Sequence, residues 1–265
     1  MKQTLILLLG SIILFTACRD KNVVKPGEPI NVAFDKAMRL YDKGKYDSAA
    51  EAFEMVTRMG RGTNYARDAQ FLLAESYFKD KQYLLAASEY ERYLSYYPQD
   101  PKREEGEFKR ALCYYKQSPR YKLDQTPTKK AIEYFQLFNN RYPDSEYVME
   151  SAKKIDELRS KLAHKTYEAA EFYLRTERYL AATIYYDLTI DQYPETEWAE
   201  KALIKQIYTY VAYAENSIKE KQAERYTSAL DAYEKFLQLF PQSKQRGDAE
   251  KYHDEALLAL SKLNS

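Results

Sequence analysis

The chain has 265 residues, of which 45% are hydrophobic and 31% charged, and its 41 Lys and Arg nearly balance its 40 Asp and Glu. This composition is typical of a globular protein. Because no positive surplus is available to neutralise phosphates, the charge argues against nucleic acid as a partner. With only 7 Gly and 9 Pro, the chain is also unlike a strand-and-turn or low-complexity protein.

The first residues have the layout of a secretory signal peptide. Lys2 precedes an apolar run from Leu5 to Phe15 that is too short to cross a bilayer comfortably. Small residues then lead directly to Cys18, and this arrangement resembles the lipobox of bacterial lipoproteins, with Phe15 in place of the usual Leu. The resemblance implies a signal peptide at residues 1–17 and an acylated Cys18 as the mature N-terminus. The alternative is an ordinary cleaved signal peptide with an accidental cysteine.

The residues after Cys18 indicate where the anchor would lie. Arg19 stands where an Asp would favour inner-membrane retention in the lipoprotein sorting rule, so we expect the outer membrane. A single Asp20 is not an acidic cluster of the surface-export kind, which favours the periplasmic face. Pro26 and Pro29 cannot continue a helix, so residues 18–30 are predicted to form the lipidated N-terminus and a tether.

A motif of Tyr-x-x-Ala-x-x-x-aromatic recurs along the rest of the chain. Its copies begin at Tyr46, Tyr83, Thr128 (in place of Tyr), Tyr179 and Tyr226. A second alanine precedes the motif alanine by twelve residues in three copies, at Ala37, Ala74 and Ala170. Small residues at both positions let two antiparallel helices approach closely. The pattern resembles the tetratricopeptide repeat.

Each repeat is predicted to contain two helices. The first helices are predicted at Asn31–Lys43, Tyr65–Asp80, Lys102–Gln117, His164–Thr176 and Thr196–Asn216. The second helices are predicted at Tyr46–Met59, Tyr83–Tyr97, Thr128–Tyr142, Tyr179–Tyr193 and Tyr226–Phe240.

The predicted fold class is therefore all-α, a right-handed α-α superhelix of about five tetratricopeptide (TPR) repeats with a C-terminal capping helix. Repeats one to three occupy residues 31–144, and repeats four and five occupy residues 164–241. Apolar residues at helical spacing predict a linking helix over residues 145–163 and the capping helix within residues 242–265.

The sequence shows no constellation that would support catalysis. Cys113 lies in an apolar-periodic stretch, where a lone thiol is most often a small buried hydrophobe, and His164 and His253 stand far apart. No Gly-rich phosphate loop or nucleophile elbow occurs. A hydrolase acting on envelope glycans would need two carboxylates facing each other across a cleft, and none stands in a suitable apolar setting. We therefore expect no enzyme, no cofactor and no metal site.

Aromatic residues recur on the first helices of the repeats, three before and four after the small alanine. They are Phe34, Tyr41, Phe71, Phe78, Phe108 and Tyr115, with Tyr167 in repeat four. A separation of seven keeps each pair on one helical face. We predict a substrate-peptide groove there, with Lys79 and Lys116 available for a terminal carboxylate. The alternative is that the rings pack between neighbouring helices as core.

The lipobox, the short tether, the irregular repeats and the chain length together resemble the BamD family of the outer-membrane β-barrel assembly machinery. The passages Leu94-x-x-Tyr97-Pro98 and Ile190-x-x-Tyr193-Pro194 support the resemblance. It implies that the N-terminal repeats bind unfolded β-barrel proteins and that the C-terminal repeats bind the periplasmic POTRA domain of BamA. The alternative is another periplasmic TPR lipoprotein that organises cell-wall or envelope complexes.

Overall fold

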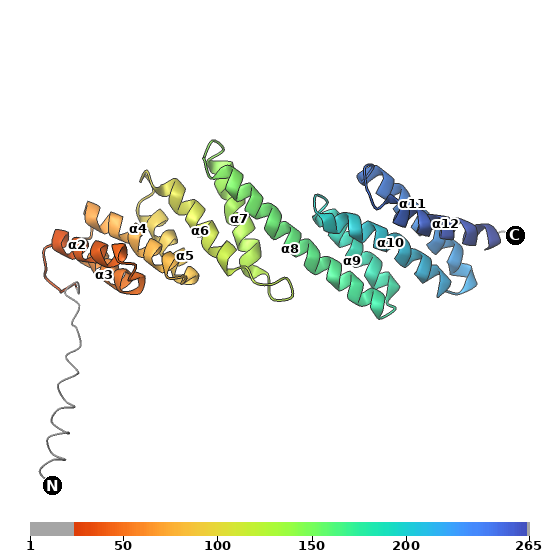
Figure 1. The fold of residues 1–265 in the computed structure, drawn as a ribbon, viewed down its shortest axis with the longest axis horizontal. Helices are drawn as coiled ribbons and strands as arrows, with labels where there is room; N and C mark the ends of the chain where they lie inside the picture. Colours follow the sequence, from red (N-terminus) through yellow and green to blue (C-terminus); the bar gives the residue numbers. More distant parts are fainter. Residues whose placement is uncertain (1–23, 264–265) are drawn as a thin grey trace, which may run out of the picture. The chain divides into compact units, whose positions relative to one another are not determined.

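The computed structural model describes residues 24–263, which form eleven α-helices and, within that range, no strand (Figure 1). The predicted signal peptide and Cys18 lie outside the described residues. The chain divides into two compact units, residues 1–117 and 118–265. The boundary falls inside the segment predicted to hold repeats one to three.

The first unit is built from helical hairpins. Its helices are α2 (Ile30–Asp42), α3 (Tyr46–Met59), α4 (Asn64–Lys79), α5 (Tyr83–Tyr96) and α6 (Arg103–Gln117). Each helix packs on the next one along the chain, and α2 also contacts α4. Val24, just before the first helix, is 4% exposed and packs into the core of this hairpin stack.

The second unit continues the same pattern with longer helices. It contains α7 (Thr126–Arg141), α8 (Val148–Arg175), α9 (Tyr179–Gln192), α10 (Glu197–Glu215), α11 (Lys219–Leu239) and α12 (Arg246–Leu263). The last helix, α12, packs on both α11 and α10, as expected for a cap at the end of a repeat stack.

The repeated alanines lie where the helices cross. All of them have no exposed surface: Ala37, Ala49, Ala74, Ala86, Ala131, Ala170, Ala182 and Ala229. The motif aromatics fill the space beside them, and Phe53, Tyr90, Phe135 and Tyr186 are likewise fully buried. A small residue at the crossing allows the close approach, and a large one beside it fills the remaining volume. The predicted all-α TPR class is confirmed.

The turn between the two helices of a repeat is also repeated. Gly44, Lys81 and Glu177 each lie two residues before the motif tyrosine, and their φ angles are 71°, 63° and 58°. In each turn the residue after it donates its backbone N–H to a carbonyl five residues earlier, as Gln82 does to Tyr77 at 2.9 Å. This left-handed conformation costs little for glycine and more for the other two residues.

Two helices differ from the sequence prediction. The linking helix at residues 145–163 and the helix His164–Thr176 were predicted as separate elements, but they form one helix, α8, of 28 residues. The prediction placed a break there because the repeat register begins at His164. No Gly or Pro lies within α8 to interrupt it. Similarly, α11 begins at Lys219, seven residues before the predicted Tyr226.

The remaining polar residues singled out in the sequence have structural surroundings. Cys113 is fully buried, and burial raises the pKa of its thiol, so it stays a neutral small hydrophobe. His164 stacks between the rings of Tyr121 and Trp198, with both pairs of ring centroids 3.9 Å apart. Within residues 24–263, no group of three His, Cys, Asp or Glu is arranged to hold a metal ion. None of the helices in that range combines the length and apolar character needed to span a membrane.

Candidate functional site

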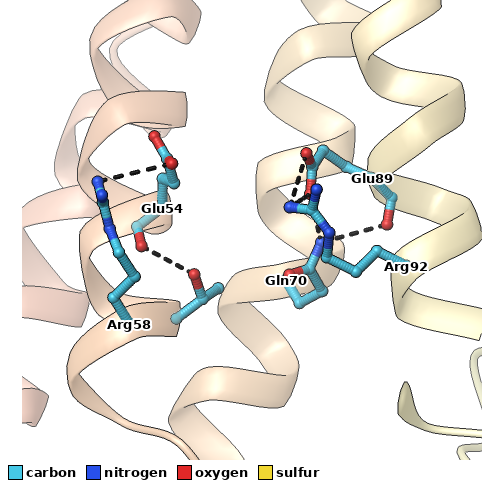
Figure 2. Close-up of polar contacts among 6 residues, drawn as sticks. Glu54, Arg58, Gln70, Glu89 and Arg92 are labelled. Carbon is cyan, nitrogen blue, oxygen red and sulfur yellow. Dashed lines mark hydrogen bonds and ion pairs between the residues drawn. The ribbon is translucent and has the colours of Figure 1, made fainter. Parts of the chain in front are cut away.

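A large cleft lies in the first unit, at the ends of α3 and α5 and the beginning of α4. Its volume is about 610 Å³. We call it the arginine cleft; its lining residues are Glu54, Thr57, Arg58, Arg61, Gly62, Ala66, Gln70, Arg92, Tyr96 and Tyr97. Figure 2 shows the side chains of its two walls.

The turn between α3 and α4 shapes one end of this cleft. A Cβ atom at Gly60 would stand 3.0 Å from both Ile30 Cδ1 and Thr63 Oγ1, so a larger residue there would require these side chains to shift. Gly62 has a φ of 82°, and Thr63 then caps α4 by accepting the N–H of Ala66 at 3.3 Å. The tight turn leaves Arg61 exposed at the edge of the cleft.

The α4–α5 wall is a connected polar network (Figure 2). Gln70 is 3% exposed, and its amide donates to the Glu89 backbone oxygen at 3.2 Å and to Glu89 Oε2 at 2.8 Å. Arg92 donates from Nη1 to both oxygens of the same carboxylate, at 3.0 and 2.8 Å. Because each of these groups is bonded to another, this wall is held in one arrangement.

The α3 wall is more loosely tied. Arg58 reaches Glu54 at only 3.6 Å, and both side chains are largely exposed. Arg61 makes no hydrogen bond or ion pair with any described residue. Two guanidinium groups are therefore available on this side to bind an anion from solution.

The lining favours a ligand that is both anionic and aromatic or apolar. Three arginines face one glutamate, and Glu89 offsets one of those arginines. Tyr96 is 64% exposed at the rim, and burial raises the pKa of the neighbouring Tyr97 hydroxyl, which remains a neutral donor. A peptide segment with a carboxylate next to an aromatic residue fits this combination.

The predicted groove on the first helices is closed at two of its rings. Phe71 and Phe108 are each 4% exposed. Phe71 meets the rings of Tyr90 and Tyr93 at 5.8 and 5.1 Å between centroids. For these two residues the packing alternative describes the structure, because neighbouring repeats leave no space over the rings.

The other members of the predicted groove remain at least partly accessible. Phe34, Tyr41, Phe78 and Tyr115 are half-buried, whereas Lys79 and Lys116 are exposed. The Lys116 ammonium lies 5.9 Å from the ring centroid of its neighbour Tyr115. These residues therefore form separate patches and not a continuous aromatic channel.

Sequence reasoning missed the arginine cleft because its residues come from three helix ends. The motif search followed positions that recur in every repeat, and Arg58, Arg61 and Arg92 do not recur. The available signal was the local excess of arginine around the Gly60 and Gly62 turn.

A second cleft, of about 470 Å³, lies in the second unit, where α7 begins, α9 ends and the middle of α8 passes behind them. Both α7 and α9 pack on α8, and the middle of α8 contributes Leu162, Lys165, Thr166 and Ala169 to the lining. Its charged lining residues are Asp124, Lys129 and Lys165.

The antiparallel helix pairs, with alanines at their crossings, define a tetratricopeptide-repeat protein. Residues 26–225 match the family model YfiO, described as an outer membrane lipoprotein. The match covers most of the chain, which therefore belongs to this family.

Curated relatives of this chain are named outer membrane protein assembly factor BamD. The relative from Vibrio cholerae is 26% identical over 249 residues, covering 90% of this chain and 98% of the relative. That from Rickettsia prowazekii is 27% identical and covers 76% and 79%. That from Caulobacter vibrioides is 24% identical over 73% of this chain, which spans 63% of that relative's length.

Solved structures similar to this chain include TPR proteins. The TPR2AB domain of yeast Sti1, in a complex with pHSP90, has a TM-score of 0.40 at 14% identity; the match covers 86% of this chain and 98% of that chain. A thermophilic TPR protein of Thermus thermophilus has a TM-score of 0.35 at 15% identity and covers 87% of this chain and 100% of its own.

Proposed function

We propose that this chain is a non-enzymatic assembly factor for outer membrane β-barrel proteins and a component of the β-barrel assembly (BAM) complex. The observation that carries this proposal is the family match over residues 26–225, together with curated relatives named BamD. A stack of TPR helices offers extended surfaces for protein ligands, which suits a receptor and scaffold.

The proposal includes a lipid anchor at Cys18, in the outer membrane and facing the periplasm. Val24, which packs into the core of the first unit, lies only six positions after Cys18. Six extended residues reach at most about 20 Å, so the anchor would hold the first unit close to the membrane surface.

A Cys18→Ala variant tests the anchor. We expect it to leave the outer membrane fraction for the soluble periplasm, and mass spectrometry of the wild-type N-terminus to show an acylated cysteine. Retention of the variant in the outer membrane would contradict a lipid anchor at this residue.

The proposal also assigns a role to each unit. The first unit would bind unfolded barrel substrates, with the arginine cleft taking a carboxylate beside an aromatic residue. Repeats four and five, in the second unit, would bind the POTRA domain of BamA. The supporting observation for the first role is the unpartnered Arg61 next to the exposed Tyr96.

Peptide binding by the purified mature chain tests the substrate role. The probe is a fluorescent peptide with the last ten residues of a barrel protein from the same organism, made as a free acid and as an amide. We expect Arg58→Ala with Arg61→Ala to weaken free-acid binding about tenfold, or about 1.4 kcal/mol. Lys43→Ala, in the exposed turn after α2 and outside the cleft, is the matched control. Equal affinity for the acid and the amide would exclude recognition of the carboxylate.

Copurification from native membranes in mild detergent separates the proposal from its alternative. A stoichiometric partner that combines POTRA domains with a β-barrel supports the BAM role. Recovery of cell-wall enzymes without that partner would instead support a TPR lipoprotein that organises other envelope complexes.

A further inference from the structure

The outer face of α9 is apolar and open. Leu180, Ile184 and Leu188 are 57%, 51% and 37% exposed. They are spaced by four residues, so they line one face of the helix. We call these three residues the α9 stripe. The opposite side of α9 is also apolar, with Ala182, Tyr186 and Ile190 in the core.

The other second helices do not share this feature. Counted from the first motif position, the residues at the same three places are Asp47, Glu51 and Met55 in α3; Leu84, Ser88 and Arg92 in α5; Lys129, Glu133 and Leu137 in α7; and Thr227, Asp231 and Lys235 in α11. Each of these helices has at least one charged residue there, and α9 has none. The TPR fold does not require apolar residues at these places, so packing within the repeat does not explain the α9 stripe.

One flank of the stripe is acidic. Asp187 and Asp191 follow the same face of α9 and share a single lysine of α11, Lys235, at 3.7 and 3.4 Å. Both carboxylates remain exposed, at 44% and 66% of their side-chain surface. Two negative charges with one positive partner leave this flank net negative.

The other flank is basic. Tyr185 and Gln192, on the opposite edge of the stripe, line the second cleft together with Lys129, Lys165 and Asp124. The Lys165 ammonium donates to the Leu123 backbone oxygen at 2.7 Å, and the Lys129 side chain forms no ion pair or hydrogen bond with any described residue. Two ammonium groups against one carboxylate leave this flank net positive.

We infer that the α9 stripe is a docking surface for an amphipathic helix of a partner protein. Leu180 and Leu188 are eight residues apart, or about 12 Å along the axis, which is two helical turns. A partner helix with apolar residues at i, i+4 and i+7 or i+8 matches this length. Charge complementarity requires Lys or Arg on the side of the partner helix that faces Asp187 and Asp191. It requires Asp or Glu on the side of the partner helix that faces Lys129. A helix with apolar residues on two opposite faces is normally covered on both, and this partner covers the outer face of α9.

Photo-crosslinking of the full chain in its native membrane tests this inference. Benzoylphenylalanine replaces Ile184 in one variant and Ser88, its counterpart on α5, in the matched control. We expect one discrete adduct from position 184 and none from position 88. Sequencing of the crosslinked peptide should show a helical segment with the stated apolar spacing and flanking charges. An adduct with a second copy of this chain, a segment without that pattern, or equal adducts from both positions would overturn the inference.

A charge reversal on exposed residues then tests the orientation of the partner helix on α9 without changing the core. Asp187→Lys with Asp191→Lys should lower the yield of the position-184 adduct at least fivefold while the thermal midpoint stays unchanged, because both side chains are exposed. An unchanged yield would overturn the charge complementarity. The inference does not depend on substrate binding by the arginine cleft or on the identity of the copurified partner, so it can fail or stand independently of the proposed function.

Discussion

The same tyrosine–glutamate hydrogen bond occurs in repeat two and in repeat four. Repeat two consists of α4 and α5, and repeat four consists of the second half of α8 together with α9. In repeat two the Tyr90 hydroxyl donates to Glu75, and in repeat four the Tyr186 hydroxyl donates to Glu171. Each glutamate directly follows the small alanine of its first helix. Burial raises the pKa of both tyrosine hydroxyls, so both remain protonated donors.

The two repeats differ in how they compensate the carboxylate. Glu75 is 6% exposed and pairs with Lys109 of α6 at 2.6 Å. Burial lowers the pKa of Lys109, but Glu75 and Glu105 raise it by more, so the ammonium stays charged. Glu171 is half-buried, and the pKa of the nearby Tyr167 hydroxyl is raised by burial and by this carboxylate. The comparison shows that a deeply buried carboxylate needs an opposite charge, whereas a half-open one is satisfied by a hydroxyl group and water.

The largest effect should come from the ring that supports Tyr90. Phe71→Ala removes a buried ring from repeat two, and we expect a loss of about 3–5 kcal/mol in the free energy of unfolding. Phe172→Ala, in the first helix of repeat four, is the control because Phe172 is 52% exposed, and it should cost less than about 1 kcal/mol. Urea unfolding measures both. Similar losses for the two variants would mean that Phe71 is not a core residue.

The charge pair of repeat two should have the next largest effect. Lys109→Met leaves the buried Glu75 carboxylate without its cation, and we expect a loss of about 3 kcal/mol in the free energy of unfolding. Lys221→Met breaks the exposed pair with Glu224 and should leave the free energy of unfolding nearly unchanged. If Lys109→Met also costs less than about 1 kcal/mol, water must reach Glu75, and the contrast between the repeats disappears.

The shared hydrogen bond can be removed from each repeat in turn. Tyr90→Phe should cost about 2 kcal/mol, because the oxygen it leaves on Glu75 is buried. Tyr186→Phe should cost about 1 kcal/mol, because Glu171 is half-open and water can replace the lost donor. Thermal unfolding of the two single variants shows which one loses more stability. A larger loss for Tyr186→Phe would contradict the greater solvent access of Glu171.

Substitutions in the inter-helix turns should have a smaller effect, and two of them should be stabilising. Lys81→Gly in repeat two and Glu177→Gly in repeat four should each raise the free energy of unfolding by about 0.5–1 kcal/mol, because glycine tolerates a positive φ. The matched opposite change is Gly44→Ala in repeat one, which should lower it by about 1 kcal/mol. Destabilisation by both glycine variants would indicate that side-chain contacts in the turn outweigh the backbone effect.

The smallest effect concerns acid sensitivity in repeat four. Arg159 Nη2 donates to Glu195 Oε2 at 3.1 Å, and the hydrogen bonding holds the pKa of Glu195 below its ordinary value. The bond therefore stabilises the fold above the unfolded-state pKa of about 4.3, and this stability is lost as the pH falls through the lower folded-state pKa. Both side chains are partly exposed, so the contribution is at most about 1 kcal/mol.

Thermal melts of the wild type and Arg159→Met between pH 7 and pH 3 measure this term. The difference in midpoint between the two proteins should be constant at neutral pH and should shrink towards pH 3. A difference that stays constant over the whole range would show that Arg159 acts through packing on the Tyr193 ring, whose centroid lies 5.3 Å from the guanidinium carbon.

The repeat architecture was predictable from the sequence because its signal is local and repeated. The motif alanines fixed which residues meet at the helix crossings, and most helix ends lie within two residues of the prediction. The break predicted at His164 was wrong because the repeat register was given more weight than the absence of a helix breaker in α8. The groove prediction expected Phe71 to be as accessible as its half-buried neighbours. Periodicity identifies residues that share a helical face, but it does not tell how closely the next helix covers that face.

The sequence by itself therefore determined the paired helices, the small and large residues between them and the family resemblance, because helical periodicity and side-chain volume act over short distances. Only the tertiary structure decided that Phe71 and Phe108 are core, that Arg58, Arg61 and Arg92 gather around one cleft, and that α9 keeps an open apolar face. These features depend on which helix ends meet in space and on which faces no other helix covers. Both are set by packing between residues far apart in the chain.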